Sequence, residues 1–140
     1  MADSDAEAVR LKELVGELGG ANRRRRQDAA HEIARLAKRD VDQLFDYAGD
    51  IIDGLDRPEA QTRWELLDVL SEMARVDPGC VEEAFGGAEA SLFDEDSSIA
   101  RLAAFRFLTS YEDYPAHLWN LPDFQVCMHL NHLHVLLQLL

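Results

Sequence analysis

The sequence has little cysteine, little lysine and no apolar targeting segment at its beginning. Its 140 residues, the usual size of one domain, include only two cysteines, Cys80 and Cys127. Two cysteines are too few for a disulfide framework. The opening residues MADSDAEAVR lack the apolar core of a secretion signal. These absences predict a cytoplasmic protein with free thiols.

Basic side chains are scarce, since 14 lysines and arginines stand against 27 carboxylates, for a net charge of −13. Only Lys12 and Lys38 are lysines. Such a surface repels nucleic-acid phosphates and anionic lipid, which disfavours nucleic-acid and membrane partners. A salt-adapted or high-GC microbial source would give the same bias without functional meaning. Attraction to a basic partner is the alternative interpretation.

Strand-like alternation is almost absent, and apolar residues recur instead at the three-to-four spacing of amphipathic helices. Six such stripes follow one another before residue 110. The first predicts a helix over residues 5–19 that buries Val9, Leu11, Leu14, Val15 and Leu18. The sixth is predicted to bury Ile99, Leu102, Ala103, Phe105, Phe107 and Leu108.

Polar residues and prolines between the stripes predict where helices begin. Asn22 and Asp40 are expected to cap the second and third helices. The third helix is predicted to be continuous over residues 41–55. Pro58 suits the first position of the fourth helix, because that position needs no N–H hydrogen bond.

The helix pattern repeats at a shift of 37 residues, and a third copy begins at Arg101 after one extra residue. A pair of helices cannot bury its apolar face alone, so repeated pairs are expected to stack on one another. Glycines share one repeat position, although glycine is unfavourable inside a helix. We expect that they allow two helices to approach closely, and the alternative is a ligand that contacts the backbone there. The superposed pairs include Arg26 with Arg63, Ile33 with Leu70, Ala37 with Ala74, and Gly49 with Gly86.

The third unit, LFDEDSSIARLAAFRFL, resembles the first-helix signature of the HEAT-repeat family of armadillo-like α-solenoids. It has an acidic turn, a β-branched residue, Arg101 and then a small residue, Ala104. The resemblance implies an all-α fold, a right-handed α–α superhelix of HEAT-like helical hairpins. Residues 1–140 would form a single domain, with an amino-terminal helix over 5–19, repeats at about 22–56, 58–93 and 96–114, and an irregular helical end over 115–140.

Acidic residues recur along the predicted third helix at spacings of four, four and three. They are Asp42, Asp46, Asp50 and Asp53, and Glu82, Glu83 and Glu89 extend them into the next unit. In HEAT proteins the second helix of each unit usually lines the concave surface, so the resemblance implies an acidic groove. We expect a non-enzymatic scaffold that presents this groove to a basic segment of a protein partner, and a merely solvated face is the alternative.

Arg23, Arg24, Arg25 and Arg26 form the one basic cluster, at the start of a predicted helix. Arginines there oppose the helix dipole, so we expect salt bridges to acidic neighbours. The alternative is that these four arginines form an anion site through which a HEAT protein binds nucleic acid.

No predicted feature assembles a catalytic centre, so no catalytic residue, metal or cofactor is assigned. His31-Glu32 resembles one metal-binding pair of deoxyhypusine hydroxylase, a HEAT-repeat enzyme, but the second copy has Asp68-Val69 at the matching positions. His31 is therefore expected to be an exposed helix residue. A bilin-lyase-like HEAT protein or lyase subunit is the enzymatic alternative.

The carboxyl end changes character after Tyr114. It contains no Lys or Arg, a single carboxylate, Asp123, and four of the five histidines. Asp123 is a predicted cap for a last helix with an apolar face, so the end is expected to pack on the repeats or to form a homodimer. Cys127 and His129, His132 and His134 could ligate zinc chemically, but a single helix cannot surround a tetrahedral ion with them.

Overall fold

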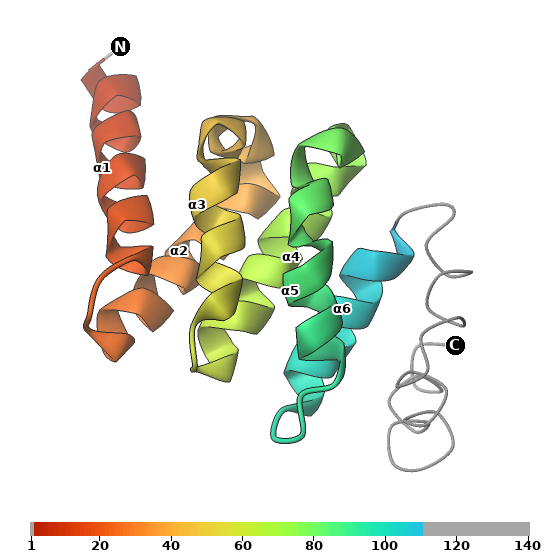
Figure 1. Ribbon diagram of the computed structural model, residues 1–140. Coiled ribbons are helices and arrows are strands. Elements are labelled where there is room, and N and C mark those ends of the chain that lie inside the picture. Colours follow the sequence, from red (N-terminus) through yellow and green to blue (C-terminus); the bar gives the residue numbers. More distant parts are fainter. Residues whose placement is uncertain (1, 111–140) are drawn as a thin grey trace.

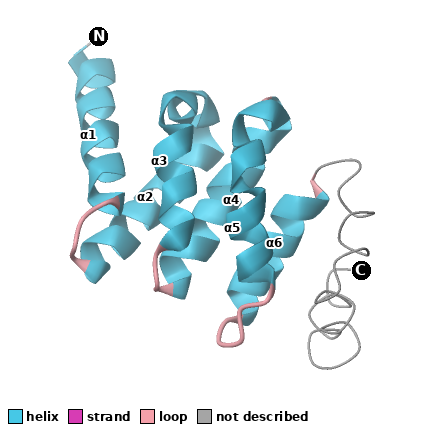
Figure 2. Cartoon of the chain, viewed as in Figure 1, coloured by secondary structure: helices cyan, strands magenta, loops and turns pink. Residues whose placement is uncertain are grey.

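In the computed structural model of the chain, the described residues are 2–110, and they form helices joined by short turns, with no strand among them (Figures 1 and 2). The prediction of an all-α fold is confirmed for this part of the chain. The elements, in which η denotes a 3₁₀ helix, are α1 (Ala2–Leu18), α2 (Arg23–Asp40), η1 (Val41–Tyr47), α3 (Ala48–Asp53), η2 (Gly54–Asp56), α4 (Ala60–Val76), η3 (Pro78–Ala84), α5 (Phe85–Leu92) and α6 (Ser98–Thr109).

The helices pack in two layers. In the first layer α2 packs on α4 and α4 packs on α6. The second layer contains α1, α3 with its flanking 3₁₀ helices, and α5 with η3, and its members cover the first layer from one side (Figure 1). The pairs lie side by side in an open row from α1 to α6.

The elements recur at a nearly constant interval along the chain. Helix α2 begins at Arg23 and α4 at Ala60, 37 residues later, and η1 and η3 begin at Val41 and Pro78, again 37 residues apart. Helix α6 begins at Ser98, 38 residues after Ala60. The interval read from the sequence is therefore the interval between equivalent elements.

The core is centred on α4, which lies between α2 and α6 and beneath the second layer. Ile33 of α2 and Leu70 of α4 occupy equivalent repeat positions and are both fully buried. Because α4 has neighbours on three sides, its apolar face is broad. Its fully buried apolar residues are Leu66, Leu67, Val69, Leu70 and Met73.

Two residues predicted to be buried are instead exposed. Val9 of α1 is 59% exposed and Ile99 of α6 is 53% exposed. Helix α1 stands at the end of the row, so only a narrow stripe of it meets the rest of the protein. Ile99 lies in the first turn of α6 beside Ala100, and Ala100 takes the fully buried position.

The predicted continuous helix over residues 41–55 is wrong, because α3 is flanked by the 3₁₀ helices η1 and η2. In Figure 1 η1 is seen nearly end-on above α3, so the chain bends between them. The tighter winding of the 3₁₀ form changes which side chains share a face. This bend determines where the carboxylates of the segment lie.

The predicted helix starts have mixed outcomes. The Asn22 side chain accepts a hydrogen bond from the Arg25 N–H at 3.0 Å, which confirms it as an N-cap. Asp40 makes no such bond to the backbone, and its carboxylate accepts one from the Gln43 side chain at 2.8 Å. Pro58 lies before the N-cap residue Glu59 rather than inside α4.

The glycines that permit close packing are not the two predicted. A Cβ atom added to Gly49 or Gly86 would meet no atom within 4 Å, so the expected close approach there is wrong. A Cβ on Gly54 would clash with Leu66, and a Cβ on Gly87 would lie 3.0 Å from the Cβ of Leu55. Close approach therefore occurs at Gly54 and Gly87.

Candidate partner-binding surface

The two layers differ sharply in charge. Residues 41–56 and 78–92, which form the second-layer elements after α1, contain eight carboxylates and no Lys or Arg. Helices α2, α4 and α6 of the first layer hold 11 of the 14 basic residues. The acidic bias of the chain is therefore not spread evenly, since these second-layer elements after α1 carry negative charge without any cation of their own.

The predicted binding carboxylates all lie on second-layer elements. Their positions are Asp42 and Asp46 on η1, Asp50 and Asp53 on α3, Glu82 and Glu83 on η3, and Glu89 on α5. The first six are exposed and form no ion pair within the described residues, whereas Glu89 is half-buried. We call these six residues the acidic surface.

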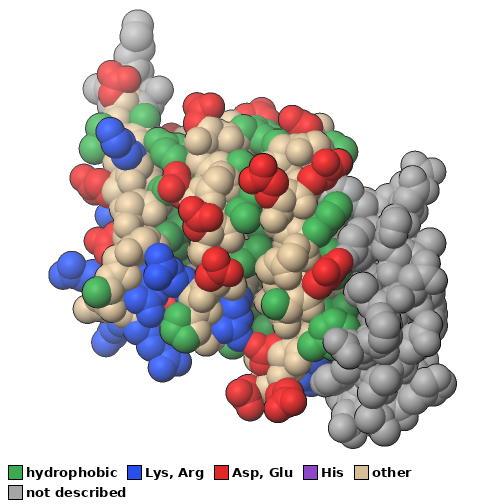
Figure 3. Space-filling view, in the orientation of Figure 1, with side chains coloured by type: hydrophobic (Ala, Val, Ile, Leu, Met, Phe, Trp, Pro, Cys, Tyr) green, Lys and Arg blue, Asp and Glu red, His purple; other side chains and the backbone are tan. Residues whose placement is uncertain are grey.

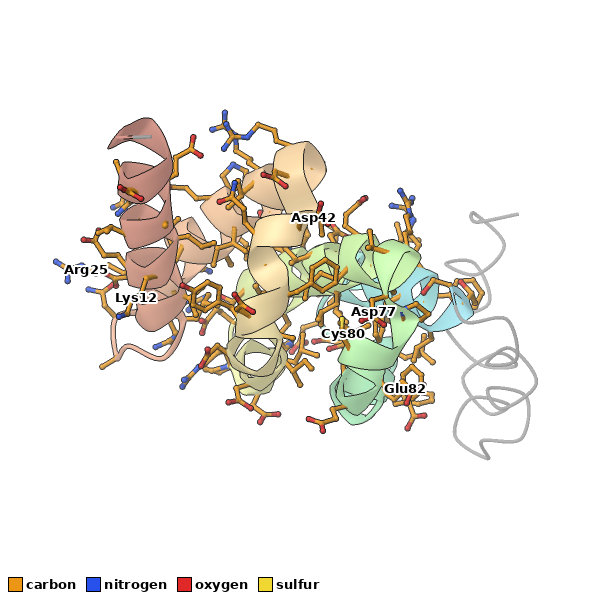
Figure 4. The ribbon with its side chains drawn as sticks, turned by 90° about the horizontal axis from the view of Figure 1, so that it is seen from above. Lys12, Arg25, Asp42, Asp77, Cys80 and Glu82 are labelled. Carbon is orange, nitrogen blue, oxygen red and sulfur yellow. The ribbon has the colours of Figure 1, made fainter. Side chains whose placement is uncertain are left out.

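The acidic surface is not the straight stripe on a single helix that the spacing suggested. A 3₁₀ helix has about three residues per turn, so Asp42 and Asp46 of η1 point in different directions. The carboxylates therefore spread across the bend between η1 and α3. In Figure 3 acidic side chains lie over α3 and α5, and basic side chains gather near the turn between α1 and α2. Figure 4 places Asp42 and Glu82 on neighbouring units, with Lys12 and Arg25 at the α1 end of the row.

A hollow of ≈ 310 Å³ lies at one end of the acidic surface, between α1 and α3. Its lining includes Asp50 and Asp53 together with two cations, Lys12 and Arg57. The buried Nε of Arg57 has no hydrogen-bond partner. The structure thus brings two of the predicted carboxylates together in a polar hollow with charges of both signs.

The arginine cluster divides into one structural residue and three surface residues. Arg26 is 8% exposed and donates from Nε and Nη2 to the two carboxylate oxygens of Glu59, at 2.6 and 2.8 Å. The side chains of Arg23, Arg24 and Arg25 are exposed and form no ion pair within residues 5–110. Salt bridging was the expected role of the cluster, and in the described residues Arg26 alone fulfils it.

Glu59 is held in its charged form by this contact. The hydrogen bonds from Arg26 are the main reason that its pKa is lowered from 4.5 to about 2, against the opposing effect of burial. The Thr62 hydroxyl also donates to Glu59, at 2.9 Å. Glu59 was not among the predicted functional residues, although its place between a proline and a helix start could have pointed to a structural role.

This depressed pKa predicts how stability depends on pH. A carboxylate with a lower pKa in the folded state contributes stability above its unfolded value, near 4.5, and loses that contribution as pH falls toward 2. Between pH 5 and pH 2, the urea midpoint of the native protein is expected to fall more steeply than that of the Glu59→Gln variant. Parallel pH profiles for the two proteins would contradict this assignment.

A second buried carboxylate, Glu65, is paired with His31. The Nδ1 atom of His31 lies 3.0 and 3.2 Å from the two carboxylate oxygens of Glu65, whose side chain is only 4% exposed. The His31 side chain is 57% exposed, so the predicted exposure is correct, but it also has a partner that the sequence did not reveal. The pair fixes α2 against α4.

Other reactive groups do not gather into a site in the described part of the chain. Within residues 5–110 no three His, Cys, Asp or Glu side chains lie together as a metal-binding group. Burial, with a contribution from Asp77, raises the pKa of the half-buried Cys80 thiol, which reduces its nucleophilic thiolate fraction. Cys127, His129, His132, His134 and the expected apolar carboxyl end lie outside the described residues.

Comparison of the chain with protein-family models, with curated proteins and with solved structures finds no match. Among residues 2–110 no helix is long and apolar enough to cross a membrane. What the chain does must therefore be argued from its own geometry and charge.

Proposed function

We propose that this chain is a right-handed α–α superhelix of HEAT-like helical hairpins that binds a basic segment of a protein partner and catalyses no reaction. The main support for this proposal is the separation of charge, with carboxylates concentrated on the second layer and most cations on the first. The fixed interval between equivalent elements and the open row of helix pairs support the HEAT-like arrangement. In such an arrangement the second helices line the concave surface, and here they carry all of the acidic surface.

The acidic surface has the properties that electrostatic docking requires. Its six carboxylates are exposed and form no ion pair with other described residues. Binding a cation there therefore breaks no ion pair within the described part of the chain. Clustered charge of one sign raises the association rate of an oppositely charged segment and disfavours partners of like charge. Each contact at an exposed site is weak, so affinity depends on several contacts made together.

We predict that neutralising four of these carboxylates weakens binding of a basic peptide by about 10- to 30-fold at low salt, which follows from about 0.4 kcal/mol per exposed pair. The variant carries Asp42→Asn, Asp46→Asn, Asp50→Asn and Asp53→Asn. The measurement is fluorescence anisotropy of a labelled peptide that alternates arginine or lysine with small residues. Affinity of the native protein is expected to fall as salt is raised.

A matched control separates a binding surface from overall net charge. The control variant carries Asp5→Asn, Glu7→Gln, Glu95→Gln and Asp96→Asn, which are exposed positions away from the acidic surface. It gains the same four units of charge and is expected to bind within about twofold of the native protein. If both variants bound the peptide equally weakly, the effect would come from net charge alone and the proposal would be wrong.

The same assay tests the nucleic-acid alternative. The probe is a labelled oligonucleotide, and the variant replaces Arg23, Arg24 and Arg25 by glutamine. The proposal expects no saturable binding of the oligonucleotide at low salt, because the net charge of −13 opposes it. Tight, salt-sensitive binding that the triple variant abolishes would favour the nucleic-acid function instead.

A further inference from the structure

Charged side chains of both signs line the hollow of ≈ 310 Å³ between α1 and α3. The cations are Lys12 of α1 and Arg57, which follows η2. The carboxylates are Asp50 and Asp53 of α3. None of these four residues forms an ion pair within the described part of the chain. A ligand that carries a cation and an anion close together would therefore complement all four charges at once.

The two carboxylates are placed to hold one cation together. Asp50 and Asp53 are three residues apart on α3, so their side chains lie on the same side of the helix. Both residues are exposed, so a cation can approach them from solvent. The next residue, Gly54, is buried against Leu66, and an added Cβ would clash there, so this end of α3 is closely packed on α4. The carboxylate pair therefore stands on a rigid base.

Arg57 is held in place by its backbone, whereas its side chain lacks a partner. Its N–H donates to the Gly54 carbonyl at 3.3 Å, and its own carbonyl accepts from Nη1 of Arg63 at 2.8 Å. Its Nη2 lies beside the end of α1, 3.9 Å from the position of a Cβ added to Gly19. The residue is half-buried and its buried Nε has no hydrogen-bond partner, so its charge is partly desolvated without compensation. Together with the exposed Lys12, it forms a place for an anion.

We propose that this hollow binds the carboxyl-terminal residue of the partner's basic segment, and that this residue is an arginine or a lysine. Its side-chain cation contacts Asp50 and Asp53. Its terminal carboxylate contacts Lys12 and Arg57. The proposal rests on the proposed function and states which end of the basic segment the hollow receives. The volume of ≈ 310 Å³ is near the lower limit of about 300 Å³ for small-ligand sites, which suits one residue rather than a longer stretch of chain.

The arrangement of charges selects a carboxyl terminus. An amino terminus would bring a further cation next to Lys12 and Arg57, and an internal stretch of basic residues would leave both cations without a counter-ion. The rest of the acidic surface lies on η1 and η3, away from α1 along the row (Figures 1 and 4). The preceding residues of the partner therefore extend from the hollow over α3 toward Glu82 and Glu83.

The test compares two peptides by fluorescence anisotropy with the full chain. Both alternate arginine with alanine, carry the label at the amino end and finish in arginine, but one has a free carboxylate and the other an amide. The free acid is expected to bind about five- to tenfold more tightly, as two partly exposed charge contacts allow. The net charge of −13 alone predicts the opposite order, because the amide is the more positive peptide. Equal affinities, or tighter binding of the amide, would overturn the proposal.

A pair of variants assigns the preference to the hollow. Lys12→Gln combined with Arg57→Gln is expected to abolish the preference for the free acid. The matched control, Arg35→Gln with Lys38→Gln, removes the same charge from exposed positions of α2 that do not line the hollow, and it should keep the preference. Lys12 is exposed, so Lys12→Gln alone tests the hollow with the fold intact and should reduce the preference about two- to threefold. An unchanged preference in the Lys12 variants would refute the assignment.

Two further peptides define the group that is recognised. An amidated peptide with an aspartate added after the last arginine is expected to bind no better than the simple amide, and full recovery of affinity would overturn capture of the chain terminus. A free acid whose last arginine and preceding alanine are exchanged is expected to bind about fivefold more weakly. Unchanged affinity would show that the last residue need not be basic.

Failure of this proposal is distinguishable from failure of the proposed function. If the acid and the amide bind equally and both lose affinity in the variant with four aspartates replaced, the acidic surface is a binding surface but the hollow does not capture a terminus. If neither peptide binds the native protein, both proposals are wrong.

Discussion

Replacing Glu59 by glutamine is expected to lower the free energy of unfolding by about 3 kcal/mol, the typical result of removing one partner from a buried ion pair. The Glu59 side chain is 1% exposed and receives two hydrogen bonds from Arg26. After the substitution the guanidinium would remain buried beside a neutral amide. Urea unfolding followed by circular dichroism measures the change.

An exposed pair of similar type supplies the control. Arg10 donates to both carboxylate oxygens of Glu32, at 3.3 and 3.2 Å, but the two side chains are 56% and 47% exposed. Glu32→Gln is expected to cost less than about 1 kcal/mol, since water and ions replace the lost partner. Equal losses in the two variants would show that burial of the Arg26–Glu59 pair does not decide its contribution.

Much of the fold could be predicted from the sequence because the repeat interval is a local and redundant signal. Ile33 and Leu70 align when the sequence is shifted by 37 residues, and both side chains are fully buried in the structure. The same shift aligned Arg26 with Arg63, and the two side chains make equivalent contacts. Periodicity fails at the margins of the row, where Val9 has the right spacing but no neighbour to bury it.

The contacts that join one unit to another could not be predicted in the same way. Arg26 stands among three other arginines, and nothing local distinguishes it as the one that pairs with Glu59, 33 residues away. His31 likewise meets Glu65 across 34 residues. Such pairs depend on how two helices face each other, which spacing within a single helix does not specify.

The acidic surface was predictable in composition but not in shape. Residues 41–56 contain five aspartates and no cation, which any reading of the sequence reveals. The spacing of those aspartates suggested one straight helix face, whereas η1 and α3 wind differently and meet at a bend. Helix propensity distinguishes α from 3₁₀ winding poorly, because tertiary packing chooses between them.

Gly87→Ala is expected to lower the free energy of unfolding by about 1–2 kcal/mol, although alanine normally favours a helix. The new methyl group would lie 2.9 Å from Cδ1 and 3.0 Å from Cβ of Leu55. The Cδ1 atom can move when the side chain changes rotamer, but the Cβ atom is fixed by the backbone of η2. The substitution therefore forces η2 and α5 apart, and urea unfolding measures the cost.

The adjacent glycine provides the control. Gly86→Ala would place a methyl group where no atom lies within 4 Å, unlike Gly87→Ala. No described glycine has a positive φ, so alanine fits the backbone there without strain. Gly86→Ala is expected to raise the free energy of unfolding by about 0.5–1 kcal/mol through helix propensity and a less flexible unfolded chain. Opposite signs at neighbouring positions of one helix cannot come from propensity alone. Stabilisation by both substitutions would mean that η2 and α5 do not approach each other at Gly87, and the spacing of the second layer beneath the acidic surface would need revision.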